Sequence, residues 1–461
     1  MIMRSLVLRS YIVFLMLSLA MEVHLFSLKA FSVESIPLSF FFMMLGMIIP
    51  LLFLQDFLLF FRDNRFLFIL VVLFLLSGLV SVLLSPFPSL YGAKWLFRYG
   101  LFLGTSFSLL FLFSLERGLG LFFLKTIAVM SFLYALLSMA EAMDKGLYRL
   151  LSDTFRNGEQ NIVHGWFRPG ATFQHPNIFG CFMSLGILIF IYLKERATVK
   201  GSVFFPAVLT LCIAMILSTS QNAMLVLLIP LVVLFFNRKT APTAILVLLM
   251  SGLLLAAMTP SQSKLTDLWN VLVNTGKTTT DQGGIHDQDM TKTPVAYSTA
   301  ATRLMLWESA IRMFKDHPVF GIGPGSYNKA LKEYASPSLL AVEKPKIDRE
   351  YLNAHNGFFS LLAEFGITGT ILAILFFLLL LRKIIQRYGP VSSSPVYAIV
   401  LGIVLSFGTD AFFYSRFYMV LSLSLLFFFA FHGEARPDAI STPSKKPVSS
   451  NEDKGGLPSP V

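Results

Sequence analysis

The fold is decided by apolar runs such as FLFILVVLFLLSGLVSVLL at residues 66–84, which contains no charged side chain. A helix crosses the hydrocarbon core of a bilayer in about 20 residues, close to the length of this run. Inside hydrocarbon every backbone N–H and C=O group needs an internal partner, which a helix supplies within one segment. The run therefore predicts a membrane-spanning helix.

The rest of the chain repeats this pattern. Of its 461 residues 55% are hydrophobic, 47 are Phe and only 14% are charged, a composition far from that of a soluble domain. The runs are about 15 to 25 residues long, whereas barrel strands alternate over about ten residues. We therefore predict an all-α, polytopic integral membrane protein with about 12 transmembrane helices, near residues 10–28, 36–55, 66–84, 93–113, 119–140, 178–193, 203–217, 222–236, 241–258, 356–381, 395–409 and 417–432.

Lys and Arg in the short connections predict the orientation of the chain, because these charges resist translocation. With the N-terminus in the cytoplasm, every inside loop is basic, whereas the short outside loops hold little more than Lys29 and Arg416. Both termini are therefore expected in the cytoplasm. The first run is expected to stay as a helix, since no small-residue cleavage site follows it. The inside positions are Arg4, Arg9, Arg62, Arg65, Arg117, Lys194, Arg196, Lys200, Arg238, Lys239, Arg382, Lys383 and Arg387.

Net charge and cysteine content argue against other classes of protein. The formal charge of +11 lies mostly in the cytoplasmic loops and the tail, where anionic lipid headgroups explain it better than a nucleic acid does. Cys181 and Cys212 are the only cysteines, and both fall in apolar runs. Neither a disulfide framework nor a thiolate metal site is indicated. We expect membrane lipids as partners and no nucleic acid.

The chain divides into four parts. Residues 1–258 contain helices one to nine with an external loop at 141–177, and residues 259–355 form a large external loop. Residues 356–432 contain helices ten to twelve, and residues 433–461, rich in Pro, Ser, Lys and Gly, are expected to be a disordered tail. Long external loops on a helical bundle are usually functional or disordered.

The second half of the large loop predicts an amphipathic helix on the external membrane face. In STAATRLMLWESAIRMFKDHP, which begins at Ser298, apolar side chains recur at helical spacing and a proline follows the end. GIGPGSY at 321–327 then makes a turn-rich connection, whereas residues 262–297 look flexible. The apolar positions of the helix are Leu304, Trp307, Ile311 and Phe314.

Two arginines are candidates for binding a phosphate group. Arg168 opens RPGATFQHPNIFG, which leads into a transmembrane helix that Asn177 can cap. Arg303 has no acidic residue three or four positions away, whereas Arg312 has Glu308 one turn before it. A guanidinium can bind phosphate or pyrophosphate through two parallel hydrogen bonds. The alternatives are an arginine that reaches lipid headgroups and a solvated charge on a helix.

His355 and Asn356 stand at the outer mouth of a spanning helix, in NAHNGFFSLLAEFGITG. A histidine near its reference pKa of about 6.5 can accept a proton at neutral pH. The alternative is a polar interfacial pair without chemistry. Glu364 lies nine residues further on, near the opposite face of the helix, and is not expected to orient His355.

Lys94 and Arg98, in YGAKWLFRYG, lie one turn apart at the outer end of the fourth helix and can extend a phosphate site. Charges that reach the interface are the alternative for this pair. Other signals are weak. Asp287 and Asp289 resemble a paired metal site but fall in the flexible half of the loop, so no metal is predicted. The sequence GIGPGS lacks the lysine of a nucleotide-binding loop.

Three blocks together resemble the O-antigen ligase superfamily, which contains O-antigen ligases, O-antigen polymerases and protein O-oligosaccharyltransferases. The blocks are RPGATFQHPN, STSQNA at 218–223, and ATRLMLWESAIRMFKDHPVFGIGPGSY followed by AHNGFFSLLAEFGITG, and the likeness covers about residues 90–432. The third block is the most specific, because the order Arg, Trp, His-Pro, Gly-x-Gly and His-Asn falls in one loop. The family often has Ser-Arg where this chain has Ser220 and Gln221.

The resemblance implies a glycosyltransferase of the bacterial cytoplasmic (inner) membrane that works without a cofactor or metal. Arg168 and Arg303 would then bind the pyrophosphate of an undecaprenyl-linked glycan donor, with Lys94, Arg98 and Asn356 as further substrate-binding residues. His355 would be the catalytic histidine, and direct displacement would invert the anomeric carbon.

Several readings stay open at this point. Lipid A core as acceptor would make the protein an O-antigen ligase, whereas another lipid-linked glycan as acceptor would make it a polymerase; a protein acceptor is a third possibility. A transporter or flippase also fits twelve helices, but no similar halves are visible in the sequence.

Overall fold

The structure is a computed structural model that describes residues 2–21, 24–28, 33–87, 89–155, 162–163, 166–173, 175–237, 239–258, 299–348, 352–389, 394–410 and 414–432. The predicted tail, the half of the large loop expected to be flexible, and Ser298 lie outside these residues.

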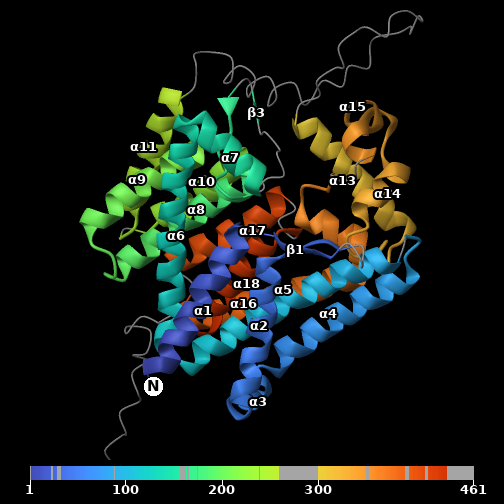
Figure 1. Ribbon diagram of the computed structural model, residues 1–461, viewed down its shortest axis with the longest axis horizontal. Coiled ribbons are helices and arrows are strands. Elements are labelled where there is room, and N and C mark those ends of the chain that lie inside the picture. The colour runs from blue at the N-terminus through green and yellow to red at the C-terminus, as the bar shows by residue number, and fades with distance from the viewer. Residues whose placement is uncertain are drawn as a thin grey trace, which may run out of the picture.

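The described chain consists mainly of helices (Figure 1). The first part runs through α1 (Ile2–Met21), α2 (Leu38–Ile48), the 3₁₀ helix η2 (Ile49–Phe53), α3 (Leu54–Asp63), α4 (Arg65–Leu84), α5 (Ser89–Leu115), α6 (Arg117–Met143), α7 (Lys145–Phe155) and α8 (Pro176–Glu195). The second part comprises α9 (Gly201–Leu217), α10 (Gln221–Phe235), α11 (Ala241–Met258), α13 (Thr299–Asp316), α14 (Tyr327–Tyr334), α15 (Pro337–Asp348), α16 (Gly357–Tyr388), α17 (Ser394–Thr409) and α18 (Arg416–Phe431). Two antiparallel hairpins join β1 (His24–Leu28) to β2 (Val33–Pro37) and β3 (Ile162–Val163) to β4 (Trp166–Phe167).

Among the described residues, seven helices are long and apolar enough to cross a membrane, and five shorter apolar helices accompany them. The prediction of a polytopic helical membrane protein is therefore confirmed. Each predicted apolar run overlaps one of these helices, and the first differs most, since α1 starts at Ile2. Arg4 and Arg9 fit within this helix because one lies 4.4 Å from the centre of the Phe53 ring and the other bonds Glu116 at 3.2 Å.

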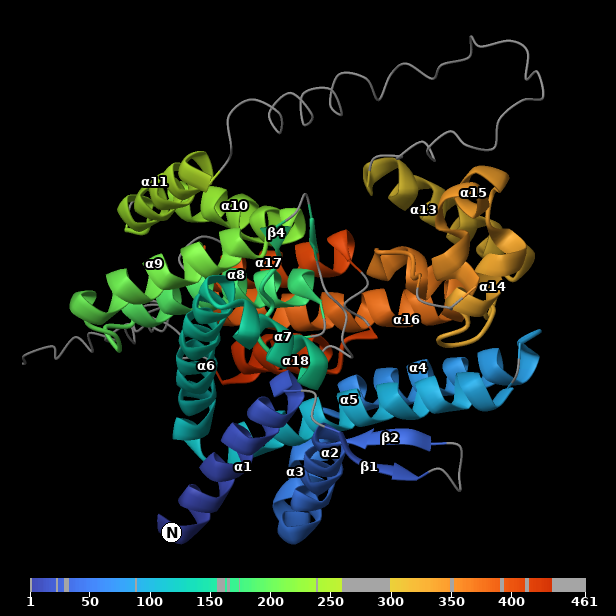
Figure 2. The ribbon, with the colours of Figure 1, turned by 45° about the horizontal axis from the view of Figure 1, so that its top comes forward.

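Among the seven long apolar helices, α8 is the most buried, and α6, α9, α10 and α17 pack around it. On another side α18 packs against α5 and α16, and α4 lies along α5 and α16 (Figure 2). Many large apolar side chains of α2, α3 and α4 remain exposed, with Leu83 at 71%. Exposed apolar side chains suit a surface that faces lipid, where burial inside the protein is not required.

A separate small core holds the end of the large loop together. Helices α13, α14 and α15 pack around Leu306, Met313 and Leu331, and the Tyr327 hydroxyl donates to the Leu306 carbonyl at 2.7 Å. Of these helices, the sequence predicts α13 but not α14 or α15. It also treats 141–177 as a loop, whereas α7 lies there.

Helix α16 is kinked where the chain before α14 docks on it. Gly366 has φ +61°, and a Cβ atom there would lie 2.5 Å from the Val319 carbonyl oxygen. The backbone N–H groups of Ile367 and Thr368 donate to the carbonyls of Pro318 and Val319 at 2.9 and 3.2 Å. A residue without a side chain is needed for this close approach. These contacts fix the segment between α13 and α14 against α16 at the kink.

Candidate active site

The side chain of Asp410 is the centre of a hydrogen-bonded network built from four segments. It directly follows α17 and is only 6% exposed. Its Oδ1 atom lies 2.9 Å from His355 Nδ1. Its Oδ2 atom accepts hydrogen bonds from the amide groups of Asn177 at 3.0 Å and Asn222 at 3.2 Å.

Each asparagine connects Asp410 to one of the predicted arginines. Arg168 donates from an Nη atom to Asn177 Oδ1 at 3.1 Å, and Arg303 does the same to Asn222 Oδ1, also at 3.1 Å. Because an amide accepts through oxygen and donates through nitrogen, each one can serve an arginine and a carboxylate at once. The structure therefore brings Arg168, Arg303 and His355 together around a carboxylate that the sequence analysis did not select.

Local structure fixes the position of Arg168. Its Nε atom donates to the Ser218 carbonyl at 2.9 Å, at the end of α9. The turn after it is anchored by buried Glu141, which accepts from the N–H groups of Gly170 and Ala171 at 3.1 and 2.8 Å. Burial lowers the pKa of the Arg168 guanidinium, with a small opposing effect of Tyr148, but an arginine remains charged at neutral pH.

The start of α8 differs from the prediction that Asn177 caps it. His175 is the cap residue, since its Nδ1 atom accepts from the Asn177 N–H at 3.1 Å, and Pro176 is the first helical residue. The Asn177 side chain is thereby free to face Arg168 and Asp410. Burial lowers the pKa of His175 to about 4, and nearby positive charges add to this against the effect of Asp410. A neutral His175 is therefore expected at pH 7.

The backbone of His355 adopts a left-handed conformation, with φ +46°, which is uncommon for a residue with a side chain. Its N–H donates to Asn353 Oδ1 at 2.8 Å, and Trp307 Nε1 donates to the Ala354 carbonyl at 2.9 Å. Trp307 also stacks on Phe359, with ring centres 5.3 Å apart. Arg303 and Trp307 lie one turn apart on α13, so this helix contacts both the network and the backbone that presents His355.

The pairing of His355 with Asp410 sets the electrostatics of the site. Burial alone would raise the pKa of the Asp410 carboxyl, but the hydrogen bond and charge of His355 and the Asn177 amide lower it below its usual range. Asp410 is therefore ionised at neutral pH. With Nδ1–H donating to this carboxylate, the Nε2 atom of neutral His355 carries a lone pair. The His355 side chain is 28% exposed and so remains accessible.

The structure gives Asn356 a role in the fold. Its Oδ1 atom caps α16 by accepting from the N–H groups of Phe358 and Phe359 at 2.9 and 3.1 Å, and its Nδ2 atom donates to the Gly408 carbonyl at 2.7 Å. These bonds join the start of α16 to the end of α17. Substrate binding by Asn356 stays a prediction, and a ligand would compete with these contacts.

Among the described residues, no hydrogen bond joins Lys94 or Arg98 to this network. Lys94 is exposed, and the Arg98 guanidinium lies 4.5 Å from the centre of the Trp95 ring.

Glu364 has other partners. It accepts from the N–H groups of Gly325 and Tyr327 at 2.7 and 3.1 Å and from the Tyr414 hydroxyl at 2.7 Å. As expected, it does not orient His355; it anchors the GIGPGS turn instead.

Sequence reasoning missed Asp410, Asn222 and the side-chain role of Asn177. The available signal for Asp410 is a carboxylate at the predicted outer end of the eleventh run, the same side as His355. Where the family often has an arginine, Gln221 is exposed at the first position of α10, and the next residue, Asn222, is buried and points into the network.

In the described ranges, no three His, Cys, Asp or Glu side chains lie together as metal ligands. Asp287 and Asp289 fall outside those ranges. Cys181 and Cys212 are buried and unpaired as cysteines.

Fold and site together define a multi-pass helical membrane protein whose polar centre is assembled from helix ends and one long loop. A family model described as O-antigen ligase matches residues 205–374. The resemblance indicated by the sequence motifs is therefore confirmed, since residues 205–374 are similar to the O-antigen ligase family. The match contains Asn222, Arg303 and His355, whereas Arg168 and Asp410 lie outside it. A search of curated proteins gave no match.

Proposed function

We propose that this protein transfers a glycan from an undecaprenyl-pyrophosphate-linked donor to an acceptor hydroxyl, with inversion at the anomeric carbon and without a metal. The observation that carries the proposal is the network in which Asp410 bonds His355 directly and reaches Arg168 and Arg303 through two asparagines. It combines one proton acceptor with two cations, the groups that a displacement of pyrophosphate requires.

His355 is the proposed general base. The acceptor hydroxyl gives its proton to Nε2 while its oxygen forms a bond to the anomeric carbon. The bond from that carbon to the pyrophosphate oxygen breaks, and the electron pair leaves with the pyrophosphate. Asp410 holds the imidazole in the required tautomer and stabilises the imidazolium that forms.

Arg168 and Arg303 are the proposed pyrophosphate ligands. Each donates to a neutral amide oxygen, so its positive charge is not cancelled by direct contact with the Asp410 carboxylate. Further N–H groups of the two guanidiniums remain to bind the leaving group, whose negative charge grows in the transition state. Lys94, Arg98 and Asn356 remain proposed as further substrate-binding residues.

We further propose that the acceptor is lipid A core, which makes the protein an O-antigen ligase in the inner membrane with the site on the external side and both termini in the cytoplasm. The test is deletion of the gene, complementation with the wild type or His355→Ala, and a gel of the surface polysaccharide. A lost ladder with unlinked polymer retained is expected. Single repeats on core would instead indicate a polymerase, and an unchanged ladder would contradict both.

A further inference from the structure

The imidazole ring of His175 uses one nitrogen in the fold and has the other available. Its Nδ1 atom accepts the Asn177 N–H at 3.1 Å and so caps α8. Among the described residues no partner bonds its Nε2 atom, and the residue is partly exposed. Because the two ring nitrogens point in nearly opposite directions, Nε2 points away from the first turn of α8.

The cap fixes both the charge and the tautomer of this ring. Nδ1 must keep its lone pair to accept the Asn177 N–H, and a neutral imidazole then carries its proton on Nε2. Protonation of Nδ1 would break this bond and add a third cation near Arg168 and Arg303. Burial, with these two positive charges and against the effect of Asp410, lowers the pKa of His175 to about 4. At neutral pH the ring is therefore an uncharged hydrogen-bond donor.

His175 shares its surroundings with the network of Asp410. Asn177, whose N–H binds the imidazole, donates from its side chain to Asp410 Oδ2 at 3.0 Å and accepts from Arg168 at 3.1 Å. The ring also lies within range of the charges of Asp410, Arg168 and Arg303. An N–H donor without a partner among the described residues is therefore held close to the two guanidiniums.

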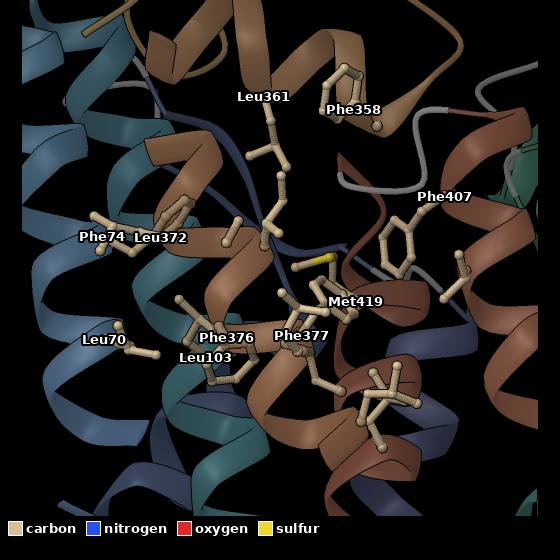
Figure 3. A pocket seen from close by; sticks show the side chains of 18 of the residues that line it. Leu70, Phe74, Leu103, Phe358, Leu361, Leu372, Phe376, Phe377, Phe407 and Met419 are labelled. Carbon is tan, nitrogen blue, oxygen red and sulfur yellow. The ribbon is translucent and has the colours of Figure 1, made fainter. Parts of the chain in front are cut away.

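On the side of α16 and α17 the polar centre borders hydrocarbon. Gly408, two residues before Asp410, lines an apolar cavity of about 440 Å³ together with side chains such as Leu361 and Phe407 (Figure 3). Such side chains donate no hydrogen bond to a ligand. Donors for a polar ligand at this centre therefore come from the segments that carry the two arginines and His175.

Resting on the proposed function, we infer that His175 is a third ligand of the leaving pyrophosphate, to which it donates a hydrogen bond from Nε2–H. As the bond between the anomeric carbon and the pyrophosphate oxygen breaks, the electron pair moves to that oxygen and the negative charge on the phosphates grows. The Nε2–H group hydrogen-bonds this charge, and its proton stays on the nitrogen. A neutral imidazole can act as such an electrophile, and it adds a donor without repelling the two arginines.

The position of His175 favours the leaving group over the acceptor. The acceptor hydroxyl lies at His355, and in a direct displacement the nucleophile and the leaving group stand on opposite sides of the anomeric carbon. The leaving group then lies with the arginines, and Asn177 connects His175 to Arg168. Interactions that strengthen as charge develops raise kcat rather than lower KM. The contribution of His175 should therefore appear in kcat and in affinity for the departed pyrophosphate.

Two substitutions separate the cap from the donor. His175→Ser keeps a good cap, because a serine hydroxyl accepts N–H groups of the first helical turn, but it lacks the distant N–H. His175→Gln keeps a neutral N–H near the position of Nε2 but is a poorer cap, so its melting temperature should be lower. His317→Ser is the matched control: His317 also precedes a proline and is partly exposed, and among the described residues no hydrogen bond joins its side chain to the network.

Each protein is purified into nanodiscs, and kcat and KM are measured for transfer from the full donor. Binding of an isoprenyl pyrophosphate without glycan, which is the leaving group itself, is measured in parallel. His175→Ser should lower kcat by roughly 10²-fold to 10³-fold, the usual cost of removing one preorganised donor, with KM for the donor changed far less. It should weaken binding of the isoprenyl pyrophosphate by about 10-fold to 100-fold, the value of a hydrogen bond to a charged group.

His175→Gln should recover part of both losses in spite of its lower melting temperature, and His317→Ser should match the wild type. A wild-type kcat for His175→Ser overturns the inference, as do activities of the two His175 variants that simply follow their melting temperatures, because the cap would then be the whole role. If the protein transfers no glycan but His175→Ser weakens isoprenyl pyrophosphate binding and His175→Gln restores it, the proposed function is rejected and the binding role of His175 stands.

Discussion

Asp410→Asn changes one atom in the centre of the site and should abolish most activity. The carboxylate accepts hydrogen bonds from His355 through one oxygen and from the amide groups of Asn177 and Asn222 through the other. An asparagine has one accepting oxygen and one donating NH₂ group. Whichever way it turns, a donor faces either Nδ1–H of His355 or two amide NH₂ groups.

The expected loss in rate follows from this mismatch. If the NH₂ group faces His355, the imidazole must present its Nδ1 lone pair, so Nε2 carries the proton and cannot act as a base. If the NH₂ group faces Asn177 and Asn222, it disturbs the hydrogen bonds through which these two asparagines hold the arginines. Either way we expect transfer to fall by about 10²-fold to 10⁴-fold, the usual contribution of a correctly placed general base. Lost hydrogen bonds to a buried charged group should also lower the free energy of unfolding by about 1–3 kcal/mol.

The assay is glycan transfer by purified protein in nanodiscs, with rates normalised to folded protein. Asp144→Asn is the control, because Asp144 is exposed and its Oδ1 atom accepts from the Gly146 N–H at 2.7 Å, a bond that asparagine can keep. Folding lowers the pKa of Asp410, so its carboxylate stabilises the fold at pH values above about 3.9, the pKa of this group in the unfolded chain. The stabilisation is lost only as the pH falls further. Wild-type rates for Asp410→Asn between pH 6 and 8 would refute the role given to the carboxylate.

Further predictions test the other parts of the site. His355→Ala should lower transfer by about 10² to 10⁴ with the labelled donor lipid still bound; normal transfer would rule out the base. Arg303→Lys should also fail, because an ammonium lacks the planar fork, whereas Arg312→Ala loses only its surface pair and should stay active. Trp307→Phe keeps the ring but not the N–H to Ala354, so kcat should fall about tenfold, the cost of one hydrogen bond, with KM for the donor unchanged; a change in melting temperature alone would indicate a purely structural role. Transfer should persist in excess EDTA, and a loss that Mg²⁺ or Mn²⁺ restores would contradict metal independence.

The membrane-spanning helices could be predicted from the sequence because each one is an apolar run in a single segment of the chain. The structure deviates from the prediction where tertiary contacts determine the ends of a helix or stabilise it. The first run was expected at 10–28, yet α1 takes in Arg4 and Arg9, whose charges are accommodated by Phe53 and Glu116 on distant segments. The helices α7, α14 and α15 have too little apolar surface to resemble membrane spans, and packing stabilises them.

The candidate site divides in the same way. Arg168, Arg303 and His355 could be selected from the sequence because the side chain of each residue, taken alone, suggests a chemical role. Asp410, Asn177 and Asn222 derive their significance from geometry: Asp410 lies 55 positions from His355, 188 from Asn222 and 233 from Asn177 in the chain. The sequence places Asp410 and His355 on the same predicted side of the membrane, but only the fold shows that these side chains touch.

The asparagines explain how a site can contain a carboxylate and still bind an anion. A direct contact between Asp410 and either arginine would form an ion pair whose partners satisfy each other, and a phosphate would have to displace it. With an amide between them, both charges are held in place, yet each guanidinium keeps N–H groups and charge for a ligand. This chain has Gln221 where the O-antigen ligases that it resembles often have an arginine, so its described network offers two arginines to the proposed leaving group. If these arginines bind pyrophosphate as proposed, the neutral amides of Asn177 and Asn222 matter more here, because neutralisation of either arginine by the carboxylate would weaken that binding.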